Sequence, residues 1–122
     1  MLSIKNLTKI YSGNKKAVDN ISLDIESGEF IAFIGTSGSG KTTALRMINR
    51  MIEATDGQIT MNGKDVRNMN PVELRRSIGY VIQQIGLMPH MTIRENIVLV
   101  PKLLKWSKEK KDSKAKELIK LV

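Results

Sequence analysis

The feature that most constrains the fold of this chain is a glycine-rich run at residues 35–42. These residues read G-T-S-G-S-G-K-T and fill every fixed position of the phosphate-binding pattern G-x-x-x-x-G-K-[ST]. The glycines let the backbone curl so that its N–H groups point at phosphate oxygens. Lys41 then reaches the β- and γ-phosphates, and the Thr42 hydroxyl coordinates Mg²⁺. The pattern predicts a loop that holds a nucleotide by its phosphates.

The residues on both sides of this loop fit the strand–loop–helix context that the pattern requires. Residues 29–34 form a short, mostly apolar run, which is typical of a parallel strand buried on both faces. After the loop, apolar residues recur at helical spacing along one face: Ala44, Met47, Ile48, Met51 and Ile52. The N-terminal end of that helix adds partial positive charge to the same anion site. A chance Gly/Ser-rich linker does not account for this context.

The composition excludes several classes of protein. With 122 residues, 41% of them hydrophobic and 26% charged, the chain has the make-up of one globular domain. It contains no cysteine, so disulfides and thiolate metal sites are excluded. No apolar stretch is long enough to span a membrane, and the first residues lack the basic-then-apolar order of a signal peptide. We therefore expect neither a membrane span nor a signal peptide.

The positive charge of the chain is concentrated near its C-terminal end. Residues 102–122 carry eight lysines and three acidic residues, which is +5 of the formal net charge of +8. This stretch has no arginine cluster, and Trp106 is its one aromatic residue, so it lacks the interleaved stacking groups of nucleic-acid surfaces. The distribution favours a solvated helical face, and we expect no nucleic-acid partner.

Alternation of apolar and polar residues, together with turn residues, predicts the strands. We expect an edge-type strand at residues 3–11 that ends in a turn at 12–14, and a half-buried strand at 21–26. Further strands are expected at residues 58–61, with an Asn-Gly turn after it, and at 78–82.

Capping residues predict the remaining helices. Asn70 and Pro71 start a short helix that ends near Ser77. Thr92 and Glu95 have the spacing of a capping box, and Pro101 is expected to kink or end the helix that they open. Ser107 is a candidate cap for the last helix, which has a further apolar stripe: Ala115, Leu118, Ile119 and Val122.

From residue 1 to the end, the chain resembles the N-terminal half of the ATPase subunit of an ATP-binding-cassette (ABC) transporter. L-T-K-I-Y at residues 7–11 is similar to the family's adenine-stacking segment, and A-V-D-N-I-S-L at 17–23 to its lead into the second strand. I-G-Y-V-I-Q-Q at 78–84 resembles the strand that ends in the Q-loop glutamine, and L-M-P-H-M-T-I-R-E-N-I at 87–97 resembles the stretch that faces the membrane subunits. The phosphate loop departs from the family only at Thr42, where serine is commoner.

The resemblance implies an α/β, P-loop NTPase (ABC ATPase) fold. It would comprise the N-terminal antiparallel β part and part of the parallel-sheet core, truncated before the Walker B strand. Residues 1–122 would then form a single incomplete domain.

The resemblance also implies roles for individual residues. Lys41 and Gln83 would be catalytic, with Gln84 as the alternative if the register is shifted by one, and Thr42 and Gln83 would bind Mg²⁺. The residues expected to contact ATP are Tyr11 (stacking on adenine), Val18, Gly35, Thr36, Ser37, Gly38, Ser39, Gly40, Lys41, Thr42 and Thr43.

The implied partners are those of an importer's ATPase. Transmembrane permease subunits would dock at the Gln83–Ile93 loop region, where Pro89 and His90 fit a docking loop better than a metal site. A second copy of the subunit would complete a homodimer. The protein would be cytoplasmic and peripheral on the inner face of the cell membrane.

A narrower likeness points to the solute. M-I-N-R-M-I at residues 47–52, Y-V-I-Q-Q-I-G-L-M-P-H at 80–90 and V-P-K-L-L-K-W at 100–106 resemble the ATPases of quaternary-amine importers. Those importers take up compatible solutes such as glycine betaine, carnitine and choline. The alternatives are an ABC importer for another small solute and a non-transport ABC ATPase. A GTPase would need the pattern N-K-x-D, and residues 14–17 (N-K-K-A) fail at its last position.

The bond-breaking half of the family's site is not in this sequence. The chain has no L-S-G-G-Q signature and no strand that ends in Asp-Glu, and His90, its one histidine, does not match the family's switch histidine. We therefore expect these 122 residues to bind nucleotide at most, with no turnover above background. Missing strands would leave apolar surface exposed, so a dimer or a swapped arrangement is plausible.

Overall fold

The computed structural model describes residues 1–84 and 86–121. The chain forms two compact units, Met1–Gly79 and Tyr80–Val122. Among the described helices, none combines the length and the apolarity that a bilayer crossing requires.

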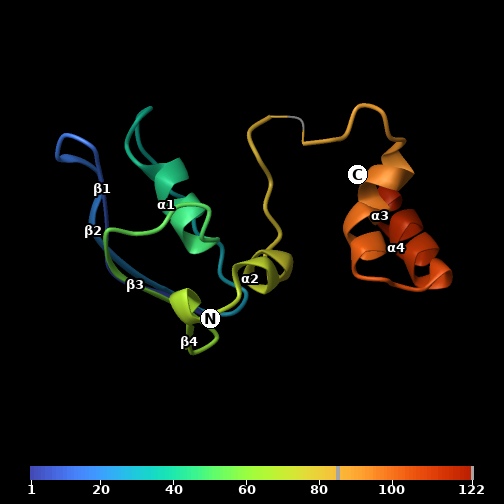
Figure 1. The fold of residues 1–122 in the computed structure, drawn as a ribbon, viewed down its shortest axis with the longest axis horizontal. Helices are drawn as coiled ribbons and strands as arrows, with labels where there is room; N and C mark the ends of the chain where they lie inside the picture. The colour runs from blue at the N-terminus through green and yellow to red at the C-terminus, as the bar shows by residue number, and fades with distance from the viewer. Residues whose placement is uncertain (85, 122) are drawn as a thin grey trace. The chain divides into compact units, whose positions relative to one another are not determined.

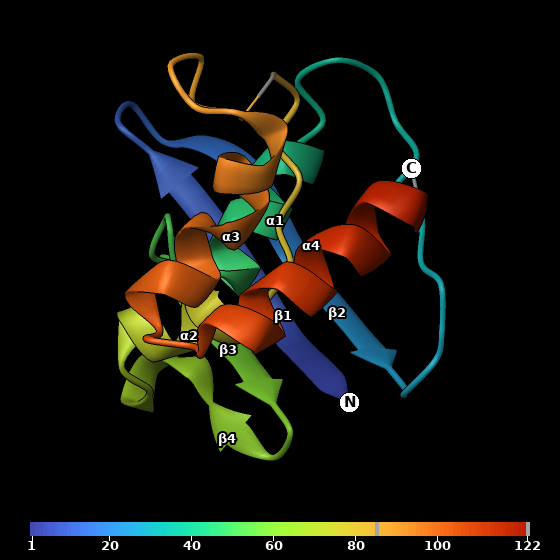
Figure 2. The ribbon, with the colours of Figure 1, turned by 90° about the vertical axis from the view of Figure 1, so that its right-hand side faces the viewer.

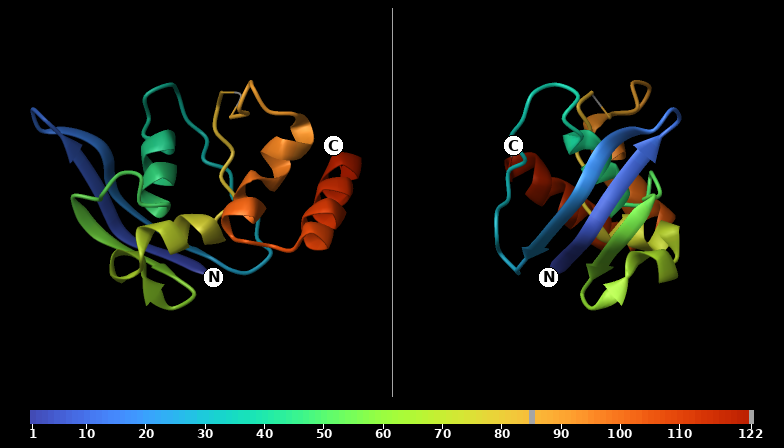
Figure 3. Two further views of the ribbon diagram at one scale, coloured as in Figure 1. Left: turned by 45° about the vertical axis from the view of Figure 1, so that its right-hand side comes forward. Right: turned by 90° about the vertical axis from the view of Figure 1, so that its left-hand side faces the viewer.

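The first unit contains a four-stranded antiparallel sheet in the order β2-β1-β3-β4 (Figure 3). Its strands are β1 (Leu2–Tyr11), β2 (Lys15–Ile25), β3 (Asp56–Met61) and β4 (Lys64–Asp65). The strand expected near residues 3–11 is present, but its expected edge position is wrong, because β1 pairs with β2 on one side and β3 on the other. Its polar residues reflect a solvated face rather than an edge, since Lys5 is exposed while Ile4 is buried.

The β1–β2 hairpin contains an irregularity next to its turn. The expected turn at residues 12–14 is present, and it places Lys15 directly opposite Tyr11. Ile10 pairs with Lys16, whereas Lys9 already pairs with Val18, so one extra residue, Ala17, is inserted in β2. This insertion is a β-bulge, a device that bends a strand and redirects its backbone groups.

Helices α1 (Lys41–Ile48) and α2 (Pro71–Ser77) lie on one face of the sheet (Figures 1 and 3). The expected cap of α2 is confirmed, because Asn70 Oδ1 accepts a hydrogen bond of 2.9 Å from the Val72 N–H. Side chains from both helices, from the sheet and from the turn that follows β4 form one buried core: Ile4, Leu7, Val18, Ala44, Met47, Ile59, Val66 and Leu74.

Helix α1 ends earlier than its apolar stripe predicts. Arg50 has a φ of 53°, and this left-handed residue turns the chain out of the helix after Ile48. The Arg50 N–H donates to Met47 O (3.0 Å) and the Met51 N–H to Arg46 O (2.9 Å), the pattern of a Schellman ending. The expectation that Met51 extends the buried face is therefore wrong, and its side chain is exposed.

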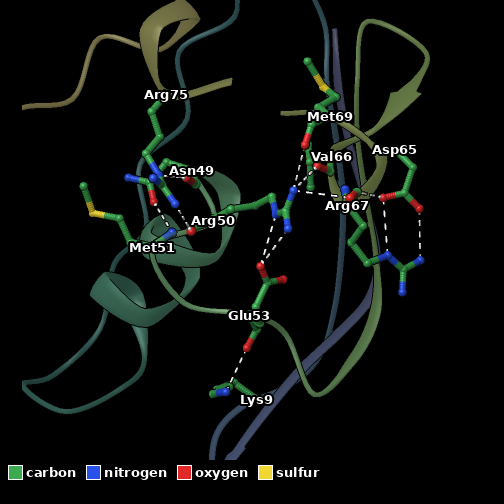
Figure 4. A network of polar contacts seen from close by, with 10 residues as sticks. All are labelled: Lys9, Asn49, Arg50, Met51, Glu53, Asp65, Val66, Arg67, Met69 and Arg75. Carbon is green, nitrogen blue, oxygen red and sulfur yellow. Dashed lines mark hydrogen bonds and ion pairs between the residues drawn. The ribbon is translucent and has the colours of Figure 1, made fainter. Parts of the chain in front are cut away.

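Two arginines satisfy the carbonyls around this helix end (Figure 4). Arg75 of α2 donates to Asn49 O (3.2 Å) and Arg50 O (2.8 Å). Arg50 in turn donates to Val66 O (3.1 Å) and Met69 O (2.9 Å) and pairs with Glu53 at 2.9 Å. Because backbone carbonyls at helix ends have no partner within the helix, these guanidinium contacts stabilise the segment after α1.

Two expected strands, the parallel strand at residues 29–34 and the strand at residues 78–82, are not formed in the described residues. In the first of these segments, Phe30 and Ile34 are 92% and 95% exposed. An apolar run becomes a strand only when a neighbouring strand completes its hydrogen-bond ladder, and the described sheet consists of β1–β4 alone. The antiparallel part of the expected fold is confirmed, whereas the residues that the structure describes form no parallel strand pair.

The second unit contains helices α3 (Ile93–Leu103) and α4 (Lys108–Leu121), which pack side by side (Figure 2). The expected capping box is confirmed, since Thr92 Oγ1 accepts from the Glu95 N–H and Glu95 Oε2 from the Thr92 N–H. Pro101 lies inside the last turn of α3 rather than at its end.

The start of α4 and its contact with α3 are each marked by a side-chain interaction. Ser107 Oγ accepts a hydrogen bond from the Lys110 N–H (3.3 Å), and Arg94 pairs with Asp112 across the two helices. Val122 of the apolar stripe lies outside the described residues.

Asp65 stabilises the short 3-10 turn η1 (Val66–Asn68) that follows β4. Its Oδ1 accepts a hydrogen bond of 2.8 Å from the Arg67 N–H, and its Oδ2 accepts from the Arg67 guanidinium (3.0 Å) and from Gln58 (2.9 Å). The Arg67 side-chain hydrogen bond is the largest cause that lowers the pKa of Asp65 from 3.8 to about 2.

Replacing Asp65 with asparagine is expected to remove a pH-dependent part of the stability. Because the pKa is lower in the folded chain than the ordinary value of 3.8, this contribution is complete above about pH 4 and is lost as the pH falls toward 2. Thermal unfolding of both proteins over this range measures it. The unfolding temperatures of the two proteins should differ most near neutral pH, and the difference should disappear at low pH. A difference that stays constant with pH would contradict this role of Asp65.

Candidate functional site

The loop between residue 34 and α1 is shaped by two glycines in left-handed conformations. Gly38 has a φ of 81° and Gly40 a φ of 91°. A Cβ atom added to Gly40 would lie 2.1 Å from the backbone oxygen of Ala17, whereas one added to Gly38 would meet open space. The loop therefore packs backbone to backbone against the bulge in β2, and only glycine fits at position 40.

Lys41 closes this loop from inside. Its Nζ donates to Gly35 O (2.7 Å), Thr36 O (2.7 Å) and Ser39 Oγ (3.1 Å). A lysine ammonium has three donors, and all three are used here. The side chain at the first residue of α1 thus holds the preceding six residues in a ring.

A pocket of about 380 Å³ lies beside the loop and extends to the β1–β2 hairpin. The structure thereby brings the predicted aromatic residue, Tyr11, into one pocket with the second half of the phosphate loop. Tyr11 is 43% exposed at the end of β1. The residues that line the pocket are Tyr11, Lys15, Lys16, Ala17, Gly38, Ser39, Gly40, Lys41, Thr42 and Thr43.

The remaining residues of the first unit that are predicted to contact ATP do not line this pocket. Gly35 and Thr36 contribute carbonyl oxygens to Lys41 and do not line the pocket, and neither does Ser37. Val18 is 3% exposed and belongs to the core, where its Cγ2 lies 3.3 Å from the position of a Cβ on Gly40. Val18 therefore supports the loop from beneath.

The predicted glutamine lies in the second unit. Gln83 and Gln84 belong to the irregular segment before α3, and both are exposed. His90 lies in a turn of the same segment, and Ile85 within it is outside the described residues. The roles expected for Gln83 and for the 83–93 region stay predictions.

Sequence reasoning missed the hairpin side of the pocket. Lys15 could have been found, because a turn at residues 12–14 places it opposite Tyr11. Lys16 lies next to it and pairs with Asp19 at 3.0 Å. Ala17 lines the pocket because of the bulge, and no local sequence pattern predicts an inserted residue in a strand.

The donor atoms present fit a magnesium ion better than a metal held by protein alone. In residues 1–84 and 86–121, no three His, Cys, Asp or Glu residues gather in a way that could hold a metal. Thr42, exposed in the first turn of α1, offers a hydroxyl oxygen beside the phosphate loop. Mg²⁺ is usually held by few protein oxygens together with phosphate oxygens and waters, and this donor set suits it.

Comparison with known families and proteins gives consistent matches. The family model described as "ABC transporter" matches residues 18–122. The chain is 68% identical to the carnitine transport ATP-binding protein OpuCA of Listeria monocytogenes and 61% identical to the glycine betaine/carnitine/choline transport ATP-binding protein OpuCA of Bacillus subtilis. Both alignments cover 100% of this chain, and 31% and 32% of the relatives. The chain thus spans about a third of the length of these curated relatives.

Solved structures agree with these matches. A dimeric bacterial ABC transporter cassette has a TM-score of 0.84 and 36% identity over 98% of this chain and 56% of its own. A dimeric ATP-binding cassette in a post-hydrolysis state with ADP and Pi has a TM-score of 0.83 and 34% identity, with the same coverage. The expected fold class is confirmed by this likeness.

Proposed function

Because the chain belongs to the ABC transporter family, we propose that it is the nucleotide-binding part of an importer's ATPase subunit. The complete subunit couples ATP binding and hydrolysis to the uptake of a quaternary-amine solute of the glycine betaine, carnitine and choline type. The observation that carries the nucleotide half of this proposal is the ring that Lys41 closes around the loop, in one pocket with Tyr11.

In this proposal Lys41 exchanges acceptors when nucleotide binds. Its ammonium leaves two neutral carbonyl oxygens and a hydroxyl for the β- and γ-phosphate oxygens. The ammonium is charged in both sets of hydrogen bonds, but only the phosphate oxygens carry negative charge, so the exchange adds attraction between opposite charges and favours the bound state. The loop N–H groups and the N-terminal end of α1 hold the same phosphates.

Other residues complete the proposed site. Tyr11 stacks on the adenine ring, and the Thr42 hydroxyl and the Gln83 amide oxygen hold Mg²⁺. The ion, when bound, neutralises charge on the phosphates. Hydrolysis in this family draws on elements that these 122 residues do not contain, the L-S-G-G-Q signature and the Asp-Glu strand end, so we expect the chain alone to bind rather than turn over ATP.

The proposed partners follow from the family and from the names of the relatives. A second copy of the subunit forms the homodimer, and permease subunits dock at the 83–93 region. The protein is then cytoplasmic and peripheral on the inner face of the membrane. Both OpuCA relatives carry quaternary amines in their names, and this supports that solute class.

Calorimetric titration of the chain with MgATP and MgGTP tests the nucleotide half. Saturable binding of MgATP is the expected result, and MgGTP should bind no more tightly, because a tyrosine ring stacks on either purine and the guanine-reading pattern is lacking. Binding of neither nucleotide would contradict the proposal.

Uptake by cells that lack the gene tests the solute class. Deletion should reduce glycine betaine or carnitine uptake at high osmolarity and leave methionine uptake unchanged. Unchanged uptake of all quaternary amines would contradict this half of the proposal without affecting the nucleotide half.

A further inference from the structure

We propose that Lys9 is a positioning residue for Tyr11, and that it sets how much of the nucleotide affinity comes from the base. The inference rests on the proposed function, since it takes Tyr11 as the residue that stacks on adenine. Lys9 does not line the pocket itself, so it would act only through the tyrosine ring.

Two contacts fix the position of the Lys9 ammonium. Its Nζ lies over the Tyr11 ring at 5.3 Å from the centroid, within the range of a cation–π interaction. The same atom donates a hydrogen bond of 2.8 Å to Glu53 O. Residues two apart on a strand share one face, and this spacing lets the lysine reach the ring.

The acceptor of this hydrogen bond is itself held in place (Figure 4). Glu53 Oε1 accepts from Arg50 Nε (3.2 Å) and Nη2 (2.9 Å), and Arg50 is anchored on Val66 O and Met69 O. A lysine side chain is flexible, so an unanchored ammonium would spread its charge over many positions. Here the segment after α1 holds the charge over one face of the ring.

The consequence concerns the free energy of stacking. A tyrosine ring has two faces, and the ammonium over one of them leaves the other for a base. A ring held before the ligand arrives loses less side-chain freedom on binding, and the saved entropy appears as affinity. The gain applies to a ligand with a base and not to its phosphates, because Lys41 and the loop hold those independently.

The test compares MgATP with magnesium tripolyphosphate, which has phosphates but no base. Calorimetric titration measures the affinity for both ligands in four forms of the 122-residue chain: wild type, Lys9→Gln, Lys9→Arg and Lys5→Gln. Lys9→Gln keeps an N–H donor for Glu53 O but loses the charge, and should weaken MgATP about threefold to tenfold while changing tripolyphosphate less than about twofold. Lys9→Arg should retain most of the MgATP affinity. Lys5→Gln, exposed on the same strand and paired with Gln58, should change neither ligand.

A double-mutant cycle with Tyr11→Leu separates positioning from a general structural effect. In the Tyr11→Leu background, Lys9→Gln should cause no further loss of MgATP affinity, because no ring remains to be held. An equal loss for both ligands, or a loss that persists without the tyrosine, would overturn the inference. So would unchanged MgATP affinity in Lys9→Gln. Wild type that binds neither ligand would instead overturn the proposed function, and equal affinity for both ligands would refute stacking on Tyr11.

Discussion

Replacing Lys41 with alanine is expected to weaken MgATP binding by about a hundredfold or more, a loss of roughly 3 kcal/mol. The substitution removes the cation that the phosphates would meet and also the three hydrogen bonds that hold Gly35, Thr36 and Ser39 in a ring. Loss of the cation weakens phosphate binding directly, and loss of the ring leaves the free loop less ordered, which adds an ordering cost on binding. Calorimetry gives the affinity directly.

Lys64 provides the matched control for this prediction. It is an exposed lysine at the start of β4 and does not line the phosphate-loop pocket, so Lys64→Ala should leave MgATP affinity unchanged. Thermal unfolding of Lys41→Ala should stay close to that of wild type, because the loop is exposed and contributes little to the core. Retained affinity in Lys41→Ala would refute the loop as the phosphate site.

Replacing Gly40 with alanine is expected to lower the free energy of unfolding by about 3 kcal/mol or more, or to prevent folding. The left-handed φ of 91° strains any residue with a side chain, and the new Cβ would lie 2.1 Å from Ala17 O, which belongs to a paired strand and cannot move freely. Urea unfolding measures the loss.

Gly38 isolates the steric part of this effect. It lies in the same loop with a similar φ of 81°, but a Cβ there meets nothing within 4 Å. Gly38→Ala should therefore cost only about 1 kcal/mol, the strain of the backbone conformation. Equal losses in the two variants would show that the contact between the loop and the bulge contributes nothing.

Local signals predicted the parts of the fold that depend on neighbouring residues. Asn70 before Pro71 and Thr92 before Glu95 were enough to place two helix starts, because a cap involves three or four consecutive residues. The Asn62-Gly63 turn was predicted for the same reason, and both residues have the positive φ that a tight hairpin turn requires.

Features that depend on distant partners were not predictable from the sequence. Whether β1 lies at the edge or the centre depends on β3, whose residues lie 48 (Thr8 and Asp56) to 59 (Leu2 and Met61) positions along the chain from their partners in β1. The end of α1 is stabilised by the distant Arg75, whose guanidinium donates to the carbonyls of Asn49 and Arg50. Residues 29–34 have the composition of a buried strand, but composition alone does not supply a neighbour for the ladder.

The candidate site shows the same division. The motif assigns the loop residue by residue, and the structure places Tyr11 in one pocket with the second half of the loop, whereas the stacking of Tyr11 on adenine stays a prediction. The family resemblance implies that Val18 contacts ATP; its side chain is 3% exposed and belongs to the core, and its role toward ATP stays a prediction. Lys9 was missed, because its partner Glu53 O belongs to a segment whose path follows from the early end of α1.

The bulge at Ala17 limits how the length of this chain can vary. Ala17 is the extra residue of β2, so its removal would leave a regular ladder, with Lys16 opposite Ile10 and Val18 opposite Lys9, and would take away the carbonyl that packs against Gly40. The turn at residues 12–14 is exposed and bears no such constraint. Insertions and deletions should therefore be tolerated at the tip of the hairpin and rejected two or three residues further along, where a single residue sets the fit between sheet and phosphate loop.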